Sequence, residues 1–185
     1  LGVNGSRNGN LRGKKGETWE GGIHVPFVVQ WKAKLPAGQK CVHPVIQLDV
    51  LPTALAAAGI EVSPDWKLDG ANLLPALTSP EATPPHDALY WRNQSRFAIR
   101  VGDWKPVKSG KIAGKATVAD AELYNLHDDP SESRNLADSE PEKVRMLKEK
   151  WEEWNKILIA PRWGNATDQD SAAQDAKPRK KKKQT

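Results

Sequence analysis

The chain has 185 residues, 38% of them hydrophobic, and a formal net charge of +5. Its single cysteine excludes an intrachain disulfide, and no apolar run approaches the roughly 20 residues of a membrane-spanning helix. The segment from Pro161 onward carries seven basic and three acidic residues, so the rest of the chain is close to neutral. This basic tail has no interleaved aromatic residues for base stacking, and no nucleic-acid partner is expected.

The N-terminal part combines a glycine-rich loop with an apolar run. Residues 1–22 contain seven glycines and the two cations Lys14 and Lys15, which is typical of a loop. Residues 24–31 then form a short apolar run, which predicts a strand buried on both faces. No signal-peptide pattern occurs at Leu1, and the compartment stays open; a periplasmic or secreted location would follow if the intact protein carries a signal peptide.

A helix is predicted next, over residues 50–58. Asp49 stands where a helix cap belongs, and Gly59 stands where the helix should stop. The proline-spotted stretch 60–85, with a short helix at 71–77, predicts a connection between two subdomains.

The C-terminal half predicts a small antiparallel sheet and one helix. A two-residue turn at Gly102-Asp103 separates two of the strands. A capping box from Ser139 to Glu142 starts the helix, whose apolar residues form one stripe. The four strands are predicted at 88–92, 97–101, 104–108 and 122–126, and the stripe consists of Val144, Leu147, Trp151, Trp154 and Leu158.

Six segments follow one another in the order that characterises a known family. They are 11–26 (Leu-Arg-Gly, Lys15, Glu-Gly-Gly-Ile, Val-Pro), 48–59 (Leu-Asp-Val-Leu-Pro-Thr, Ala-Gly), 69–77 (Asp-Gly, Leu-Leu-Pro-Ala-Leu), 102–105 (Gly-Asp-Trp-Lys), 122–126 (Glu-Leu-Tyr-Asn-Leu) and 129–137 (Asp-Pro-Ser-Glu, Asn-Leu-Ala). In this order they resemble the C-terminal third of the formylglycine-dependent, arylsulfatase-like sulfatases.

The resemblance implies an α/β fold, the C-terminal part of an alkaline-phosphatase-like sulfatase fold with a small α+β subdomain. Residues 1–78 would belong to the catalytic α/β domain. Residues 79–160 would form the α+β subdomain, with four antiparallel strands and one helix, and residues 161–185 a disordered basic tail. Pro106 stands where the family usually has an aliphatic residue, so we expect a local distortion of its strand.

The resemblance also implies hydrolysis of sulfate esters, by an arylsulfatase or a polysaccharide sulfatase. Lys15 matches the lysine that contacts the sulfate group and is the catalytic candidate. His24, which stands where the family usually has arginine, and His86 and Arg92, which lie where the family borders its substrate cleft, are further candidates for substrate binding. The histidines show no metal-ligand spacing, so no metal site is assigned in this chain.

Calcium and a formylglycine nucleophile are implied for the intact enzyme. The family's Cys/Ser-x-Pro-x-Arg motif is absent, because Cys41-Val42-His43-Pro44 does not match it. We expect both sites in a missing N-terminal part of the same enzyme, which would be this chain's partner, and we expect the fragment alone to be inactive. The substrate would be a sulfate ester, with a sulfated polysaccharide as one option.

Two alternatives remain open from the sequence. A free-standing polyanion-binding module could use Lys14, Lys15 and the basic tail, with salt-sensitive binding. A relative of the same superfamily could instead hydrolyse phosphate or phosphonate esters, because related folds share a cation-lined site.

Overall fold

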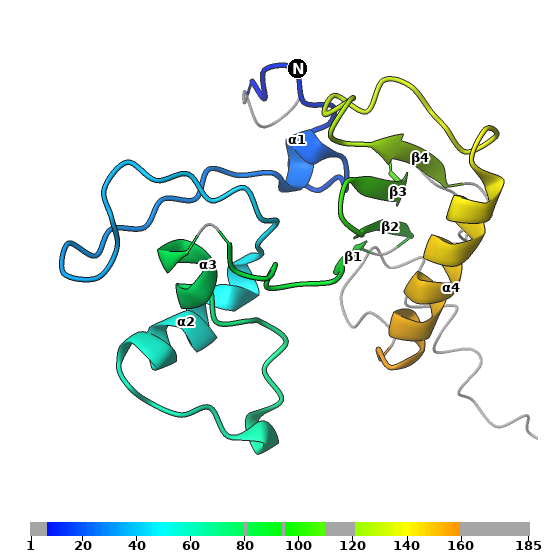
Figure 1. Cartoon of the computed structure of the whole chain (residues 1–185). Helices are drawn as coiled ribbons and strands as arrows, with labels where there is room; N and C mark the ends of the chain where they lie inside the picture. Colours follow the sequence, from blue (N-terminus) through cyan, green and yellow to red (C-terminus); the bar gives the residue numbers. More distant parts are fainter. Residues whose placement is uncertain (1–6, 80, 94, 110–120, 160–185) are drawn as a thin grey trace, which may run out of the picture.

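A four-stranded antiparallel sheet with one long helix organises the C-terminal half of the chain (Figure 1). The structure, a computed structural model, describes residues 7–79, 81–93, 95–109 and 121–159. The strands are β1 (Leu89–Asn93), β2 (Arg96–Arg100), β3 (Trp104–Lys108) and β4 (Glu122–Asn125), in the order β1-β2-β3-β4, and the helix is α4 (Pro141–Lys156). The predicted sheet and helix are confirmed, with boundaries within a few residues.

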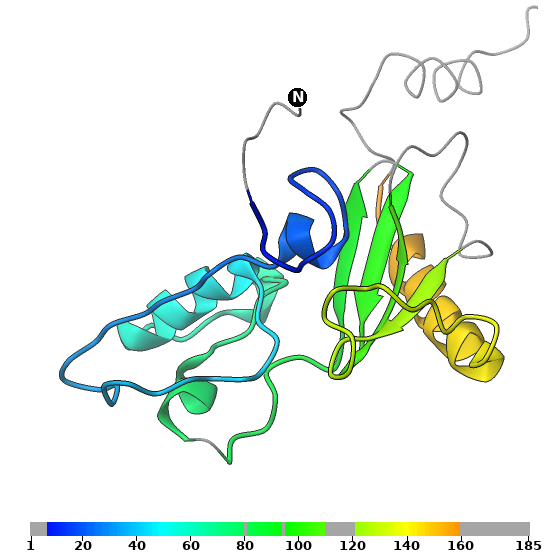
Figure 2. The same ribbon diagram turned by 90° about the horizontal axis from the view of Figure 1, so that it is seen from above.

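The two faces of this sheet are covered by different parts of the chain (Figure 2). Alternate side chains of a strand point to opposite faces. In β2, Phe97 and Ile99 pack against Trp151 of α4, while Ala98 packs against Trp19 of the N-terminal loop. The short helix α1 (Glu20–Ile23) continues that loop. The sheet is therefore sandwiched between α4 and the segment that carries Lys15.

Pro106 interrupts the hydrogen-bonded ladder without shifting the strand. Between β2 and β3, Ala98 pairs with Val107 and Val101 pairs with Trp104, which is the same register. The positions between these pairs, which include Pro106, are not bridged, because proline has no N–H to donate. On its other side Pro106 stays paired with Leu123.

The start of α4 differs from the prediction. Glu140 is the N-cap and makes no side-chain cap, and Pro141 occupies the first turn. The Ser139 hydroxyl instead donates to the carbonyl of Leu136, 3.1 Å away, so the predicted capping box is wrong. The Ser139 hydroxyl is therefore bonded within the turn before the helix and does not cap α4. The apolar stripe is confirmed, because Leu147 and Trp151 are buried.

The other half of the chain is a set of short helices. They are η1 (Gln47–Asp49), α2 (Val50–Ala57), η2 (Pro64–Trp66) and α3 (Leu74–Thr78). Helix α2 ends before Gly59, which has a φ of +72° as a helix stop requires. Asp49 precedes α2, as predicted, but its side chain does not cap it. Its oxygens accept hydrogen bonds from the N–H groups of Ile46 and Ala71.

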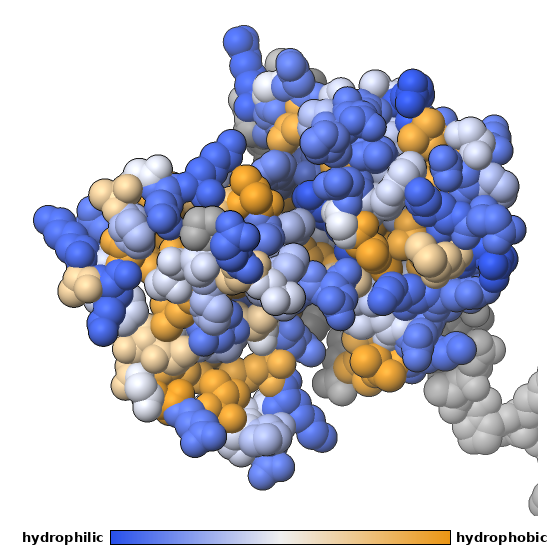
Figure 3. Space-filling model, in the orientation of Figure 1, coloured by the Kyte–Doolittle hydropathy of each residue, from blue (hydrophilic) through white to orange (hydrophobic). Residues whose placement is uncertain are grey.

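The prediction of a buried strand at residues 24–31 is wrong. The segment has no regular secondary structure, and the exposed fraction of Val28 is 90% and that of Val25 is 67%. A strand needs a neighbour for its N–H and C=O groups, and none of the described strands lies beside this segment. Apolar side chains also reach the surface on helix α2 and around it (Figure 3), where Val50, Leu51 and Ile60 are about half exposed. The predicted tail at 161–185 falls outside the described residues.

Candidate functional site

Lys15 lies at the exposed tip of a tight turn. The N–H of Glu17 donates to the carbonyl of Lys14 (3.0 Å), and the N–H of Lys14 donates to the Glu17 carboxylate (3.0 Å). Within the described parts of the chain the Lys15 side chain has no hydrogen bond and no ion pair. Its ammonium group is therefore available to an external anion.

The two glycines that follow Glu20 allow a close approach between backbones. A Cβ atom on Gly21 would lie 2.6 Å from the carbonyl oxygen of Arg12, and one on Gly22 would lie 2.2 Å from that of Glu17. Neither glycine has a positive φ. Glycine is required at both positions because α1 packs directly against the carbonyl groups of residues 11–19, the loop that carries Lys15 and is called the lysine loop below. A turn of the chain is not the reason.

A buried ion cluster fixes α1 to the sheet. Lys105 in β3 is fully buried, and its ammonium group lies 2.7 Å from Oε1 of Glu20 and 2.8 Å from Oε1 of Glu132. The contact with Glu132 is ionic, since its geometry is not that of an aligned hydrogen bond. The other oxygen of Glu132 accepts the N–H of Glu20 at 2.6 Å. One cation thus joins two carboxylates from distant segments.

This cluster contains more acidic groups than basic ones. Glu20 and Glu132 bring two carboxylates to a single buried ammonium. Burial raises the pKa of Glu132 above its ordinary value, against the opposing effect of Lys105. Glu132 also has a φ of +54°, an uncommon backbone conformation for a residue with a side chain. The surrounding contacts therefore hold it in a conformation that it does not favour.

Arg12 ties the beginning of the loop to β4. Its guanidinium group lies 3.6 Å from the ring centre of Trp19. It donates to the hydroxyl of Tyr124 (2.9 Å) and to the backbone carbonyl of Glu132 (3.1 Å). Desolvation, with the neighbouring Glu122 carboxylate, raises the pKa of Tyr124. Sequence reasoning missed Arg12 as an anchor, although it belongs to the Leu-Arg-Gly part of the lysine-loop motif.

The base of the loop is held by Thr18. Its hydroxyl lies within hydrogen-bond distance of the carbonyls of Phe97 (3.3 Å) and Lys108 (3.2 Å), and its N–H donates to Ser109 (3.1 Å). Thr18, Trp19 and Glu20 are all buried, whereas residues 14–16 are exposed. The loop that carries Lys15 thus has a buried base and an exposed, cationic tip.

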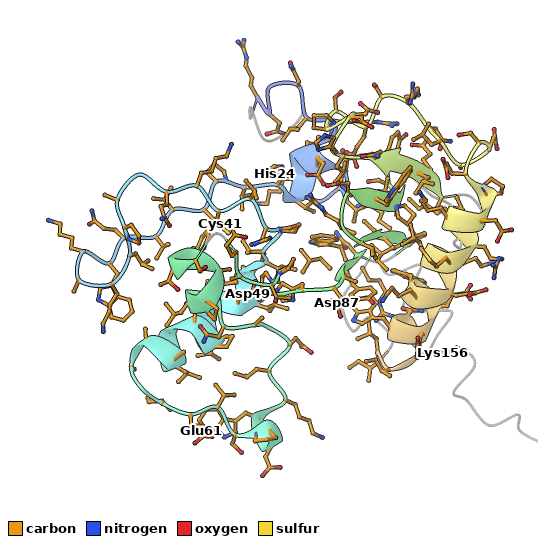
Figure 4. All side chains as sticks on the ribbon, in the orientation of Figure 1. His24, Cys41, Asp49, Glu61, Asp87 and Lys156 are labelled. Carbon is orange, nitrogen blue, oxygen red and sulfur yellow. The ribbon has the colours of Figure 1, made fainter. Side chains whose placement is uncertain are left out.

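The other candidate residues make contacts elsewhere in the molecule; Figure 4 labels His24, next to α1, and Asp49, the residue before α2. His24 follows α1, and its Nδ1 lies 3.1 Å from Oε2 of Glu20, with 60% of the side chain exposed. His86 contacts both oxygens of the buried Asp49 carboxylate, at 2.8 and 2.9 Å. In the described residues no hydrogen bond or ion pair joins His24, His86 or Arg92 to Lys15.

Arg92 packs on the face of the sheet that α4 covers. It donates to the side chain of Asn155 (2.6 Å) and to the carbonyl of Ile159 (2.5 Å). Both partners belong to α4 or to the residues after it. These contacts stabilise the C-terminal end of α4 on β1, so a role of Arg92 in substrate binding stays a prediction.

Neither a metal-ligand cluster nor a membrane-spanning helix occurs in the described residues. The described part of the chain holds no group of three or more His, Cys, Asp or Glu side chains that could bind a metal ion. Over the same residues, no helix combines the length and apolar character needed to cross a membrane.

Comparison with known proteins identifies the family. The family described as "N-sulphoglucosamine sulphohydrolase, C-terminal" matches residues 14–157. Steryl-sulfatase of Rattus norvegicus is 37% identical over 117 residues, which cover 60% of this chain and 20% of that protein. Arylsulfatase D of Homo sapiens is 32% identical over 169 residues, which cover 74% of this chain and 28% of that protein.

Solved structures agree with this assignment. The crystal structure of Ps i-CgsB has a TM-score of 0.76 and 30% sequence identity, covering 95% of this chain and 38% of that one. The structure of PsFucS1 sulfatase from Pseudoalteromonas sp., at 21% identity and a TM-score of 0.59, shares the fold. The matched regions cover 20% and 28% of the length of the two sulfatases compared above. The chain therefore belongs to the family described as "N-sulphoglucosamine sulphohydrolase, C-terminal".

Proposed function

We propose that this chain belongs to an enzyme that hydrolyses sulfate esters, and that Lys15 contacts the sulfate group. The observation that carries the proposal is the exposed Lys15 ammonium, which has no hydrogen bond or ion pair among the described residues and lies on a loop whose base is buried. Negative charge on the sulfuryl oxygens and on the leaving oxygen must be stabilised as the S–O bond breaks. A cation already held in place supplies this stabilisation without reorganisation during the reaction.

The same proposal assigns a role to each of two parts of the chain. Residues 1–78 contribute to the catalytic α/β domain and residues 79–160 form the subdomain that supports the lysine loop. The described residues offer no cluster that fits calcium, and Cys41 does not stand in a formylglycine motif. Both groups would be supplied by another part of the intact enzyme.

A saccharide sulfate is the substrate class that we propose. Ps i-CgsB, which covers 95% of this chain at 30% identity, has also been solved in complex with k-i-k-neocarrahexaose. A further relative, from Sus scrofa, is named N-acetylgalactosamine-6-sulfatase and is 33% identical over 101 residues. His24, His86 and Arg92 are secondary candidates for contacts with the sugar.

The test compares two neighbouring lysines in the full-length enzyme. Removing one charge-stabilising group from an active site typically lowers kcat by about 10²-fold or more. We expect this loss for Lys15→Ala and almost none for Lys14→Ala, measured with 4-nitrophenyl sulfate and with sulfated oligosaccharides. Equal effects of the two substitutions would contradict the assigned role of Lys15.

Further measurements separate the alternatives. The 185-residue chain alone should not turn over 4-nitrophenyl sulfate; turnover above background would overturn that part of the proposal. Preferential hydrolysis of 4-nitrophenyl phosphate by the full-length enzyme would favour a phosphate esterase. Tight, salt-sensitive binding of heparin by the isolated chain, with no hydrolysis by the full-length protein, would favour a polyanion-binding module.

A further inference from the structure

The β1–β2 hairpin contacts the lysine loop at the residue next to Lys15. Nη1 of Arg96 donates to the carbonyl of Gly16 at 2.9 Å, and Nδ2 of Asn93 donates to the same oxygen at 3.3 Å. Asn93 and Arg96 are paired across the hairpin, so their side chains leave the same face of the sheet. This is the face on which Ala98 packs against Trp19.

The tip of the loop lacks packing of its own. Gly16 has a φ of +90°, and a Cβ atom there would meet nothing within 4 Å. The turn closes on itself through Lys14 and Glu17, while the buried anchors begin at Thr18. The two hydrogen bonds to the Gly16 carbonyl therefore join this exposed tip to the rigid sheet.

We propose that Arg96 and Asn93 are positioning residues for Lys15. They hold the Gly16 peptide group and thereby fix the direction in which the preceding residue projects its ammonium group. Arg96 contributes more than Asn93 to holding the Gly16 carbonyl, because its hydrogen bond is shorter and its donor carries a charge. The proposal rests on the proposed contact of Lys15 with sulfate, but the effect on the turn can be measured without any activity.

The first experiment is amide hydrogen exchange on the 185-residue chain. The N–H of Glu17 is bonded within the turn to Lys14, so its exchange rate reports how often the turn opens. We expect Arg96→Ala to raise that rate several-fold and Arg96→Lys to restore part of the protection. The matched control is Arg100→Ala, which removes an Arg–carbonyl bond to Gly102 from the same strand. An unchanged rate in Arg96→Ala, or an equal rise in Arg100→Ala, would overturn the proposal.

The second experiment is a double-mutant cycle on the full-length enzyme with a sulfate ester. We expect Arg96→Ala to lower kcat about tenfold, with KM little changed, and to have no further effect in a Lys15→Ala background. Effects that multiply would mean that Arg96 acts independently of Lys15, for example through its own contact with substrate, and would overturn the positioning role. If Lys15→Ala alone left kcat/KM unchanged, the proposed function of Lys15 would fail, and hydrogen exchange would still decide whether Arg96 holds the turn.

Discussion

Two apolar stretches of this chain have similar residues and opposite environments. In β2, Phe97, Ala98 and Ile99 have no exposed surface, because α4 covers one face of the sheet and the lysine loop covers the other. In residues 24–31, Val25 and Val28 are mostly exposed. Hydrophobic composition favours burial in both, but burial also needs a partner surface within reach. The difference identifies the sheet as the rigid support of the site.

The largest expected effect comes from Lys105, the cation inside the support. Lys105→Met keeps the length of the side chain but leaves Glu20 and Glu132 as two buried carboxylates without their cation. Breaking a buried ion pair costs about 3–5 kcal/mol of unfolding free energy, measurable by urea denaturation of the 185-residue chain. The control is Lys148→Met on the exposed face of α4, which should cause no measurable change. Equal stability of Lys105→Met and the unmodified chain would show that the cluster is not a structural anchor.

A pair of apolar truncations tests the comparison directly. Leu123 in β4 is fully buried, so Leu123→Ala should cost about 2–5 kcal/mol of unfolding free energy. Val28 is 90% exposed, so Val28→Ala should change stability by less than about 0.5 kcal/mol. Urea denaturation measures both. A large loss on Val28→Ala would mean that residues 24–31 are packed in solution, contrary to the structure.

Local patterns were sufficient to predict the sheet and the long helix. The turn at Gly102-Asp103 and the 3-4 spacing on α4 are determined by neighbouring residues, and both are present. The environment of residues 24–31 could not be read in this way, since an apolar run does not say which surface will cover it.

The candidate site shows the same limit. The loop and its exposed lysine followed from a basic, glycine-rich motif. The residues that anchor this loop could not be predicted from local sequence, because Lys105 lies 85 residues from Glu20 along the chain and Glu132 lies 112 residues from it. A lysine inside a strand is ordinarily a solvent-facing residue, so burial of Lys105 depends on tertiary contacts alone. Likewise, nothing near Lys15 in the sequence indicates that Arg96 reaches its turn.

The smallest expected effect is a pH dependence that distinguishes two carboxylates only three residues apart. The pKa of Glu132 is raised by burial, so its contribution to stability is fully present below its ordinary value of 4.5 and is lost as the pH rises through the raised pKa. The pKa of Asp129 is lowered, because hydrogen bonds from Arg134, Ser133 and Ser131 outweigh the opposing effect of burial. Its contribution is present above the ordinary value of 3.8 and is lost as the pH falls.

Substitution by the neutral amide removes each titration in turn. The unfolding free energy of the unmodified chain minus that of Glu132→Gln should decrease as the pH rises above 4.5. The same difference for Asp129→Asn should decrease as the pH falls below 3.8. Urea denaturation across a pH series measures both slopes. Slopes of the same sign would contradict the buried environment of Glu132, and with it the argument that a single ammonium is shared by two carboxylates beneath the lysine loop.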